Sequence, residues 1–217
     1  MKIHADSSPS VIEVSTGALG PNLPQRIGRR LWLPMLTMAL MAFPVALLLA
    51  FLRAGMVAAG GAQTSAVALG QFEVAAMFLG FATVFGAVSF AIARILGVLR
   101  SGGGAVQEAA GTPVHTLRMP VTGKLFLGLM AMAMMALLAA IAAHVYLGVT
   151  ALGADKATLV SIQSWSEFLE GLRRLAVFTY LLAIALGLAT IIRVLHFQAV
   201  RIRELPDERT LGADQQA

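Results

Sequence analysis

Four long apolar stretches limit this chain more than any other feature of its sequence. They run through residues 31–52, 74–93, 125–149 and 175–192, and charged residues or glycines bound each of them. The hydrocarbon core of a bilayer is about 30 Å thick, and a helix that rises about 1.5 Å per residue needs about 20 apolar residues to cross it. None of the stretches has the alternating pattern of a barrel strand. The sequence therefore predicts an all-α, polytopic membrane protein with four transmembrane helices.

The composition supports a membrane protein and excludes several kinds of chemistry. The chain is 58% hydrophobic and 12% charged, whereas soluble domains carry about 25% charged residues. It has no cysteine, so disulfides, thiolate metal sites and cysteine nucleophiles are excluded. No Walker loop, dinucleotide glycine pattern, HExxH or GxSxG motif occurs. We expect no catalytic residues, no bound cofactor and no metal site, and thus no enzyme activity of its own.

The placement of the basic residues predicts the orientation of the chain. Four lysines or arginines fall on one predicted side: Arg53, Lys156, Arg173 and Arg174. Twelve fall on the other: Lys2, Arg26, Arg29, Arg30, Arg94, Arg100, Arg118, Lys124, Arg193, Arg201, Arg203 and Arg209. Cytoplasmic loops carry the excess of Lys and Arg, so both termini are predicted in the cytoplasm. Because these charges flank the spans, they indicate contact with anionic lipid rather than nucleic acid.

The two halves of the chain resemble each other. The methionine- and alanine-rich segment 35–42 lies 94 positions before its counterpart at 129–136. The second span of each half ends in an arginine followed by an aliphatic residue and leucine, at Arg94 and Arg193. Both halves begin on the same side of the membrane. The sequence therefore predicts two parallel helical-hairpin repeats with an N-in/C-in topology.

The predicted organisation has five segments. A mobile cytoplasmic tail (1–26) and a first hairpin (27–100, with spans 31–52 and 72–99) precede a Gly/Pro-containing cytoplasmic linker (101–120). A second hairpin (121–203, with spans 124–150 and 171–199) and a cytoplasmic tail (204–217) follow. Residues 161–172 are expected to form an amphipathic turn or two on the membrane surface before the last span descends.

The first span also has a second interpretation. Arg29 and Arg30 precede it as in a twin-arginine export signal, which would be cleaved after the span. The apolar run is longer than the 7–15 residues typical of such a signal, and it has a counterpart in the second half. We therefore expect an uncleaved first helix.

Small residues are placed where helices could approach closely. Ala82 and Gly86 in the second span, and Ala183 and Gly187 in the fourth, form small-xxx-small pairs. In lipid, close packing at such pairs drives helix association. We expect the second and fourth spans at the centre of the bundle.

The histidines and methionines are the residues of this chain that could bind a redox group. His144 lies near the outer end of the third span and His196 at the cytoplasmic end of the fourth, so the two cannot hold one haem. Methionines recur at helical spacing in the first and third spans and could bind Cu(I), but methionine is also an adaptable filler of apolar space. Packing is the favoured interpretation of the methionines.

Four residues remain as candidates for function. Arg94 and Arg193 could contact lipid headgroups or a partner, although snorkelling to the interface is the favoured explanation of both. Glu73 and His144 are ionisable groups in or near the membrane, which makes them functional candidates by default. The alternative is that both are simply interfacial.

The function that the sequence favours is non-catalytic. We expect an accessory or structural subunit of a complex in a bacterial inner membrane, in contact with membrane lipids and with protein partners or copies of itself, and with no nucleic-acid partner. The alternative is a small transporter or channel acting as an oligomer, which would use Glu73 and His144 on the outer side and Arg94 and Arg193 on the inner side. A haem- or copper-binding redox protein is the third hypothesis.

Overall fold

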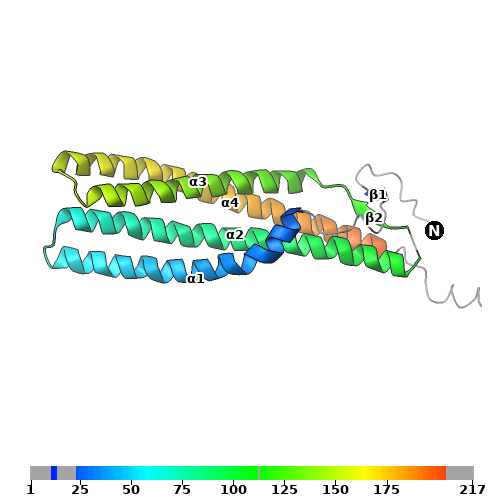
Figure 1. The fold of residues 1–217 in the computed structure, drawn as a ribbon. Coiled ribbons are helices and arrows are strands. Elements are labelled where there is room, and N and C mark those ends of the chain that lie inside the picture. Colours follow the sequence, from blue (N-terminus) through cyan, green and yellow to red (C-terminus); the bar gives the residue numbers. More distant parts are fainter. Residues whose placement is uncertain (1–10, 14–22, 112, 204–217) are drawn as a thin grey trace, which may run out of the picture. The chain divides into compact units, whose positions relative to one another are not determined.

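The computed structural model describes residues 11–13, 23–111 and 113–203. They form four helices and one antiparallel two-stranded ribbon (Figure 1). The helices are α1 (Leu23–Ala58), α2 (Gln63–Ala109), α3 (Val121–Ala151) and α4 (Lys156–Arg203), and the strands are β1 (Val11–Glu13) and β2 (His115–Leu117). All four helices are long and apolar enough to cross a membrane, which confirms the helical class and the number of candidate spans.

Helices α2 and α4 are much longer than the spans predicted from hydropathy. They contain 47 and 48 residues, or about 70 Å each at the rise of an α-helix. The expected linker at 101–120 is helical as far as Ala109, and β2 begins at His115. The expected surface turn at 161–172 is part of the continuous helix α4. Hydropathy detects only the portion of a helix that suits hydrocarbon, so it missed these extensions.

The glycine run at 102–104 remains helical because tertiary contacts hold it. A Cβ atom on Gly103 would overlap the side chains of Gln198 and Arg201 of α4, so the α4 side chains lie directly on the α2 backbone there. The Gln198 amide donates a hydrogen bond to the carbonyl of Leu99, with a distance of 2.8 Å. Glycine disfavours an isolated helix, but here it permits this close approach.

The ribbon joins the segment before α1 to the segment after α2. Val11 is opposite Leu117, and Glu13 is opposite His115. The predicted N-terminal tail 1–26 thus contains β1 and the first residues of α1. The rest of that tail, and the predicted C-terminal tail 204–217, lie outside the described residues.

The chain divides into two packed units. Unit 1 comprises the described residues within 1–29, 90–125 and 185–217, and unit 2 comprises 30–89 and 126–184. In unit 1, the Gln107 side chain accepts a hydrogen bond from the backbone N–H of His115, and the hydroxyls of Thr122 and Thr190 lie 3.0 Å apart. Unit 2 contains the two short turns between helices, which lie at the same end of its bundle (Figure 1).

Alanine dominates the buried faces of the helices. Among the described residues, thirteen of the twenty-one buried apolar side chains are alanine. On α4 most of the buried positions follow one another at three- and four-residue intervals, as in the seam of a left-handed coiled coil: Leu169, Arg173, Ala176, Tyr180, Ala183, Gly187 and Thr190. Small side chains at such a seam let helix backbones approach closely. The predicted small pairs Ala82/Gly86 and Ala183/Gly187 are all buried.

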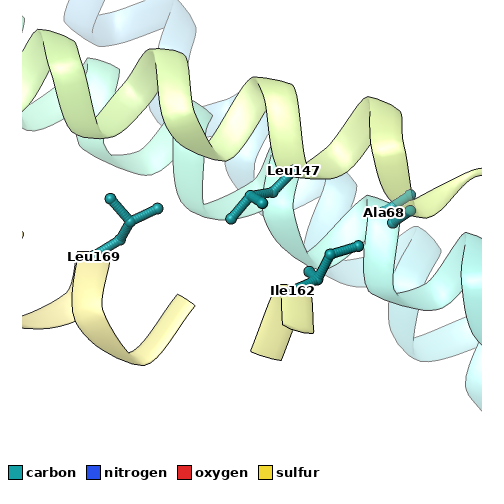
Figure 2. Close-up of a cluster of buried hydrophobic side chains, with 5 residues drawn as sticks. Ala68, Leu147, Ile162 and Leu169 are labelled. Carbon is teal, nitrogen blue, oxygen red and sulfur yellow. The ribbon is translucent and has the colours of Figure 1, made fainter. Parts of the chain in front are cut away.

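Two clusters of larger apolar residues fill the core of unit 2. One joins Ala68, Leu147, Ala151, Ile162 and Leu169 from α2, α3 and α4 (Figure 2). The other centres on Leu137 and Tyr180, which are fully buried against the small residues Ala82, Ala133 and Ala176. Helix α2 is the most enclosed, with 44% of its apolar window buried, and α1 is the least, with 17%.

The methionines at the buried seam pack against a glycine. A Cβ atom on Gly86 would lie 3.1 Å from Sδ of Met35 and 3.3 Å from Cε of Met134. Methionine is flexible and polarisable, so it can fill the space beside a bare backbone. These contacts support packing as the role of Met35 and Met134.

The turns of unit 2 have ordinary local explanations. Gly60, with φ of 69°, adopts the left-handed conformation after α1 that glycine accepts without strain. Asp155 precedes α4, and its side chain accepts a hydrogen bond of 2.8 Å from the backbone N–H of Thr158. Hydrogen bonds from the Thr158 side chain and its N–H hold the pKa of Asp155 below its ordinary value.

Adjacent glycines of α2 provide a matched test of the packing in unit 1. Gly102→Ala should stabilise the protein by about 0.5–1 kcal/mol, because alanine favours the helix and a Cβ there meets no atom within 4 Å. Gly103→Ala should be less stable than Gly102→Ala by about 1–2 kcal/mol, since it displaces Gln198 from Leu99. Thermal unfolding in detergent, followed by helicity, measures both. Equal midpoints would contradict the helical packing of this segment.

Candidate functional site

His144 lies on the buried seam of α3. Its side chain is 1% exposed, and Nδ1 is 2.6 Å from the amide oxygen of Gln71 on α2. A carbonyl oxygen can only accept a hydrogen bond, so Nδ1 donates the proton and Nε2 carries the lone pair. The Nε2 atom is buried and meets no hydrogen-bond partner among the described residues.

Gln71 connects His144 to a third helix. Its amide nitrogen donates a hydrogen bond of 2.6 Å to the hydroxyl oxygen of Ser166 on α4. Gln71 is 9% exposed and lies on the same face of α2 as the buried Ala68 and Ala75. The three polar side chains, called the Gln71 network below, thus link α2, α3 and α4 through directional contacts.

The geometry of the Gln71 network limits the chemistry that it can perform. Gln71 lies between His144 and Ser166, so the imidazole has no direct hydrogen bond with the hydroxyl and cannot activate it as a general base does. Within the described residues, no group of three His, Cys, Asp or Glu side chains gathers as a metal site. The network favours one register between α2, α3 and α4. The second N–H of the Gln71 amide and the O–H of Ser166 remain as hydrogen-bond donors.

Glu73 forms an ion pair with Arg53 across α1 and α2. Its carboxylate oxygen is 3.3 Å from Nη1 of Arg53, and the side chains of Arg53 and Glu73 are 49% and 27% exposed. A partly exposed pair of this kind contributes little to stability. The Arg53 guanidinium lies against the backbone of Gly70, where a Cβ atom would be 3.1 Å from Cζ.

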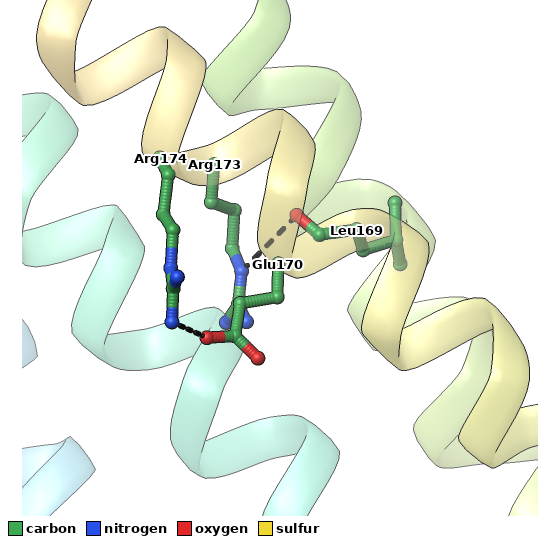
Figure 3. A network of polar contacts seen from close by, with 4 residues as sticks. All are labelled: Leu169, Glu170, Arg173 and Arg174. Atoms are coloured by element: carbon green, nitrogen blue, oxygen red, sulfur yellow. Dashed lines mark hydrogen bonds and ion pairs between the residues drawn. The ribbon is translucent and has the colours of Figure 1, made fainter.

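Arg173 is the buried cation of unit 2. Its side chain lies on the seam of α4, with 8% of the residue exposed. Its Nε donates to the carbonyl of Leu169 over 3.3 Å, and its guanidinium lies 4.6 Å from the centroid of the Phe78 ring (Figure 3 shows the backbone bond). The stacking on an aromatic face partly compensates for lost hydration. Beside it, Arg174 pairs with Glu170 on the exposed side of the helix.

A cleft of about 490 Å³ opens beside the Gln71 network. Its walls come from the end of α1, the first turns of α2 and the first turns of α4. Its polar lining consists of Arg53, Gln63, Gln71, Lys156, Gln163 and Ser166. All of these residues belong to unit 2. The volume falls within the range of small-molecule sites.

The structure does not gather the four candidates into one site. His144 forms a hydrogen bond with Gln71, whereas Glu73, two positions further along α2, lies on another face of that helix and pairs with Arg53. Arg94 and Arg193 belong to unit 1, where both are exposed, and neither lines the cleft. His144 is buried within unit 2.

Sequence analysis did not identify Gln71, Ser166 or Gly70 as site residues. Gln71 carried a usable signal, because it occupies a position three and four residues from the buried Ala68 and Ala75. An amide at a seam of small residues needs a partner on the facing helix. The pairing with His144, 73 positions away, depends on the register between helices, which hydropathy does not record.

Paired substitutions test the Gln71 network. Gln71→Leu or His144→Leu alone should destabilise the protein by about 1–3 kcal/mol, because each leaves a buried polar partner without a hydrogen bond. The double variant should recover about 1 kcal/mol relative to the sum of the single changes. Unfolding midpoints in detergent measure the three values, with Thr150→Val as a control that loses only a bond within its own helix. Strictly additive effects would contradict the network.

Comparisons with known proteins complete the description of the site. The chain matches no family model, no curated protein and no solved structure. We therefore interpret the site from its own contacts and charges.

Proposed function

We propose that this protein is a non-catalytic accessory or structural subunit of a complex in a bacterial inner membrane. It would cross the membrane four times as two parallel hairpins with both termini in the cytoplasm. Its partners would be membrane lipids and other protein chains or copies of itself. The single observation that carries the proposal is the extension of α2 and α4 into a second, strongly basic packed unit.

Exposed apolar side chains support membrane insertion. Helix α1 exposes Leu40, Met41, Leu47 and Phe51, each with more than half of its surface accessible. Soluble monomers rarely expose contiguous apolar patches of such extent. Acyl chains would cover these faces without hydrogen bonding, and the continuous helices satisfy their own backbone groups.

The charge of unit 1 supports an orientation with this unit in the cytoplasm. Its described residues include two carboxylates, Glu13 and Glu108. They include nine cations: Arg26, Arg29, Arg94, Arg100, Arg118, Lys124, Arg193, Arg201 and Arg203. Cytoplasmic segments next to membrane spans carry this bias.

The buried alanines support the duplicated architecture. Ala39 and Ala46 of α1 are buried, and so are Ala133 and Ala140 of α3, each 94 positions later. The spacing equals that of the repeated sequence segments. Equivalent positions in the two hairpins thus perform the same packing role, as expected after a duplication.

The length of α2 and α4 supports the role of a subunit. Each is about 40 Å longer than the hydrocarbon core is thick. The extra turns are held by specific side-chain contacts, such as Gln198 on Leu99 and Gln107 on His115. A folded, basic unit attached to a membrane anchor offers a surface complementary to an acidic partner.

A small transporter or channel is the second candidate function. The cleft beside the Gln71 network and the Arg53–Glu73 pair favour it, because intramembrane ionisable groups often line substrate paths. Glu73→Gln distinguishes the two functions. It should abolish flux in a carrier that uses Glu73, and it should leave assembly of a structural subunit intact.

Single engineered cysteines test the orientation, because the chain has none of its own. An impermeant maleimide added to intact spheroplasts should label Ala62→Cys, in the turn between α1 and α2. It should label Ser101→Cys only after the membrane is permeabilised. Labelling of Ser101→Cys from outside would contradict the proposed topology.

Native mass measurement tests the subunit role. The protein purified in mild detergent should appear in an assembly heavier than one chain. The double reversal Arg193→Glu and Arg203→Glu should reduce the assembled fraction about tenfold at low salt, because it places like charges opposite the partner. The matched control is Arg174→Glu on unit 2, which should leave the assembly unchanged. A lone monomer for the unaltered chain would contradict the proposal.

A further inference from the structure

The cleft in unit 2 has an unusual balance of hydrogen-bonding groups. Arg53 and Lys156 contribute cations, and Gln63 and Gln163 contribute amides that can donate. None of the residues that line the cleft is an aspartate or glutamate. A site that presents many donors and positive charge is suited to an anion.

The Gln71 network supplies further donors at the same cleft. The Gln71 amide has two N–H groups, and the described bond to Ser166 uses one of them. The Ser166 oxygen accepts that bond, so its own O–H remains to donate. The hydrogen bond between His144 and the Gln71 carbonyl oxygen orients the Gln71 amide so that its nitrogen points towards Ser166.

Arg53 is held in place by two features of α2. Its guanidinium rests on the bare backbone of Gly70, which also lines the cleft. Its Nη1 is 3.3 Å from the Glu73 carboxylate, so one of its five N–H groups has a described ion-pair partner. Glu73 therefore positions Arg53 and also competes with any incoming anion for it.

The remaining lining of the cleft is aliphatic. Val67 and Val74 of α2 line it together with Leu159, Val160 and Ile162 of α4. Arg53 directly follows the apolar stretch 31–52, at the level where headgroups meet hydrocarbon. A ligand with an anionic head and an apolar body would place its charge against the cations and amides of the cleft and its apolar part against the aliphatic side chains.

We propose that this cleft binds one anionic phospholipid, whose phosphate is held by Arg53 and Lys156 and whose first acyl carbons contact the aliphatic wall. Basic pockets between transmembrane helices on the cytoplasmic side bind lipid headgroups through the same charge pairing, and this cleft would do so at the outer end of the spans. The Gln71 amide and the Ser166 hydroxyl supply neutral donors to the same phosphate. The site is separate from the basic unit 1 on which the proposed function depends.

Titration of the purified full chain with defined lipids tests the proposal, with bound lipid counted by native mass spectrometry. Phosphatidylglycerol should bind at least about tenfold more tightly than phosphatidylcholine. Arg53→Gln should weaken phosphatidylglycerol binding about tenfold, a difference of about 1.4 kcal/mol. Arg174→Gln is the matched control, because Arg174 is an exposed arginine of the same unit that does not line the cleft.

A second variant should change affinity in the opposite direction. Glu73→Gln removes the carboxylate that competes for Arg53, so it should tighten phosphatidylglycerol binding several-fold. A misfolded protein would not bind more tightly, so this result separates a local effect from loss of structure. Unchanged or weaker binding by Glu73→Gln would overturn the assigned role of Arg53.

Two further outcomes would overturn the proposal. Equal affinity for phosphatidylglycerol and phosphatidylcholine would show that the negative charge is not recognised. Displacement of phosphatidylglycerol by an equimolar amount of inorganic phosphate would show that the cleft holds a free anion and not a lipid. Retention of phosphatidylglycerol under that challenge is the expected result.

Discussion

Close approach of helix backbones at alanine is the interaction on which the rest of this structure depends. In hydrocarbon, burying leucine against leucine gains little, since lipid tails offer the same contact. Alanines such as Ala82, Ala140 and Ala183 bring the helix axes together and allow dispersion between backbones to accumulate. The large apolar side chains can then point outward without loss. Within the apolar spans, buried and exposed positions are therefore distinguished by side-chain size more than by polarity.

Because the helix backbones lie close together, the few buried polar side chains can form hydrogen bonds from one helix to another. Gln71 reaches both His144 and Ser166 because its neighbours on the α2 seam are small. A hydrogen bond between helices specifies one register, whereas contacts between alanines tolerate many. Arg173 on Phe78 adds a second directional contact to the same bundle. Packing thus supplies the attraction in unit 2, and a handful of polar contacts select the arrangement.

Hydropathy was sufficient for the number and position of the four helices, but not for their length. The run at 102–104 was interpreted as a linker because glycine disfavours an isolated helix, yet Gln198 and Arg201 make it part of α2. The amphipathic pattern of residues 161–172 predicts a turn or two on the membrane surface. In the structure, Ile162 and Leu169 pack into the core and keep that segment in α4. His144 and Glu73 were identifiable as unusual residues, but their partners depend on contacts between distant segments.

The ribbon of β1 and β2 has a consequence for how the chain is built. One strand precedes α1 and the other follows α2, so the ladder can close only after both helices have been synthesised. In the proposed topology the two strands lie on the same face of the bilayer, because α1 and α2 together would cross it twice. If only one of α1 and α2 crossed the membrane, β1 and β2 would lie on opposite sides of it and could not pair. In the proposed topology, this short ladder would therefore close only once α1 and α2 had both crossed the membrane.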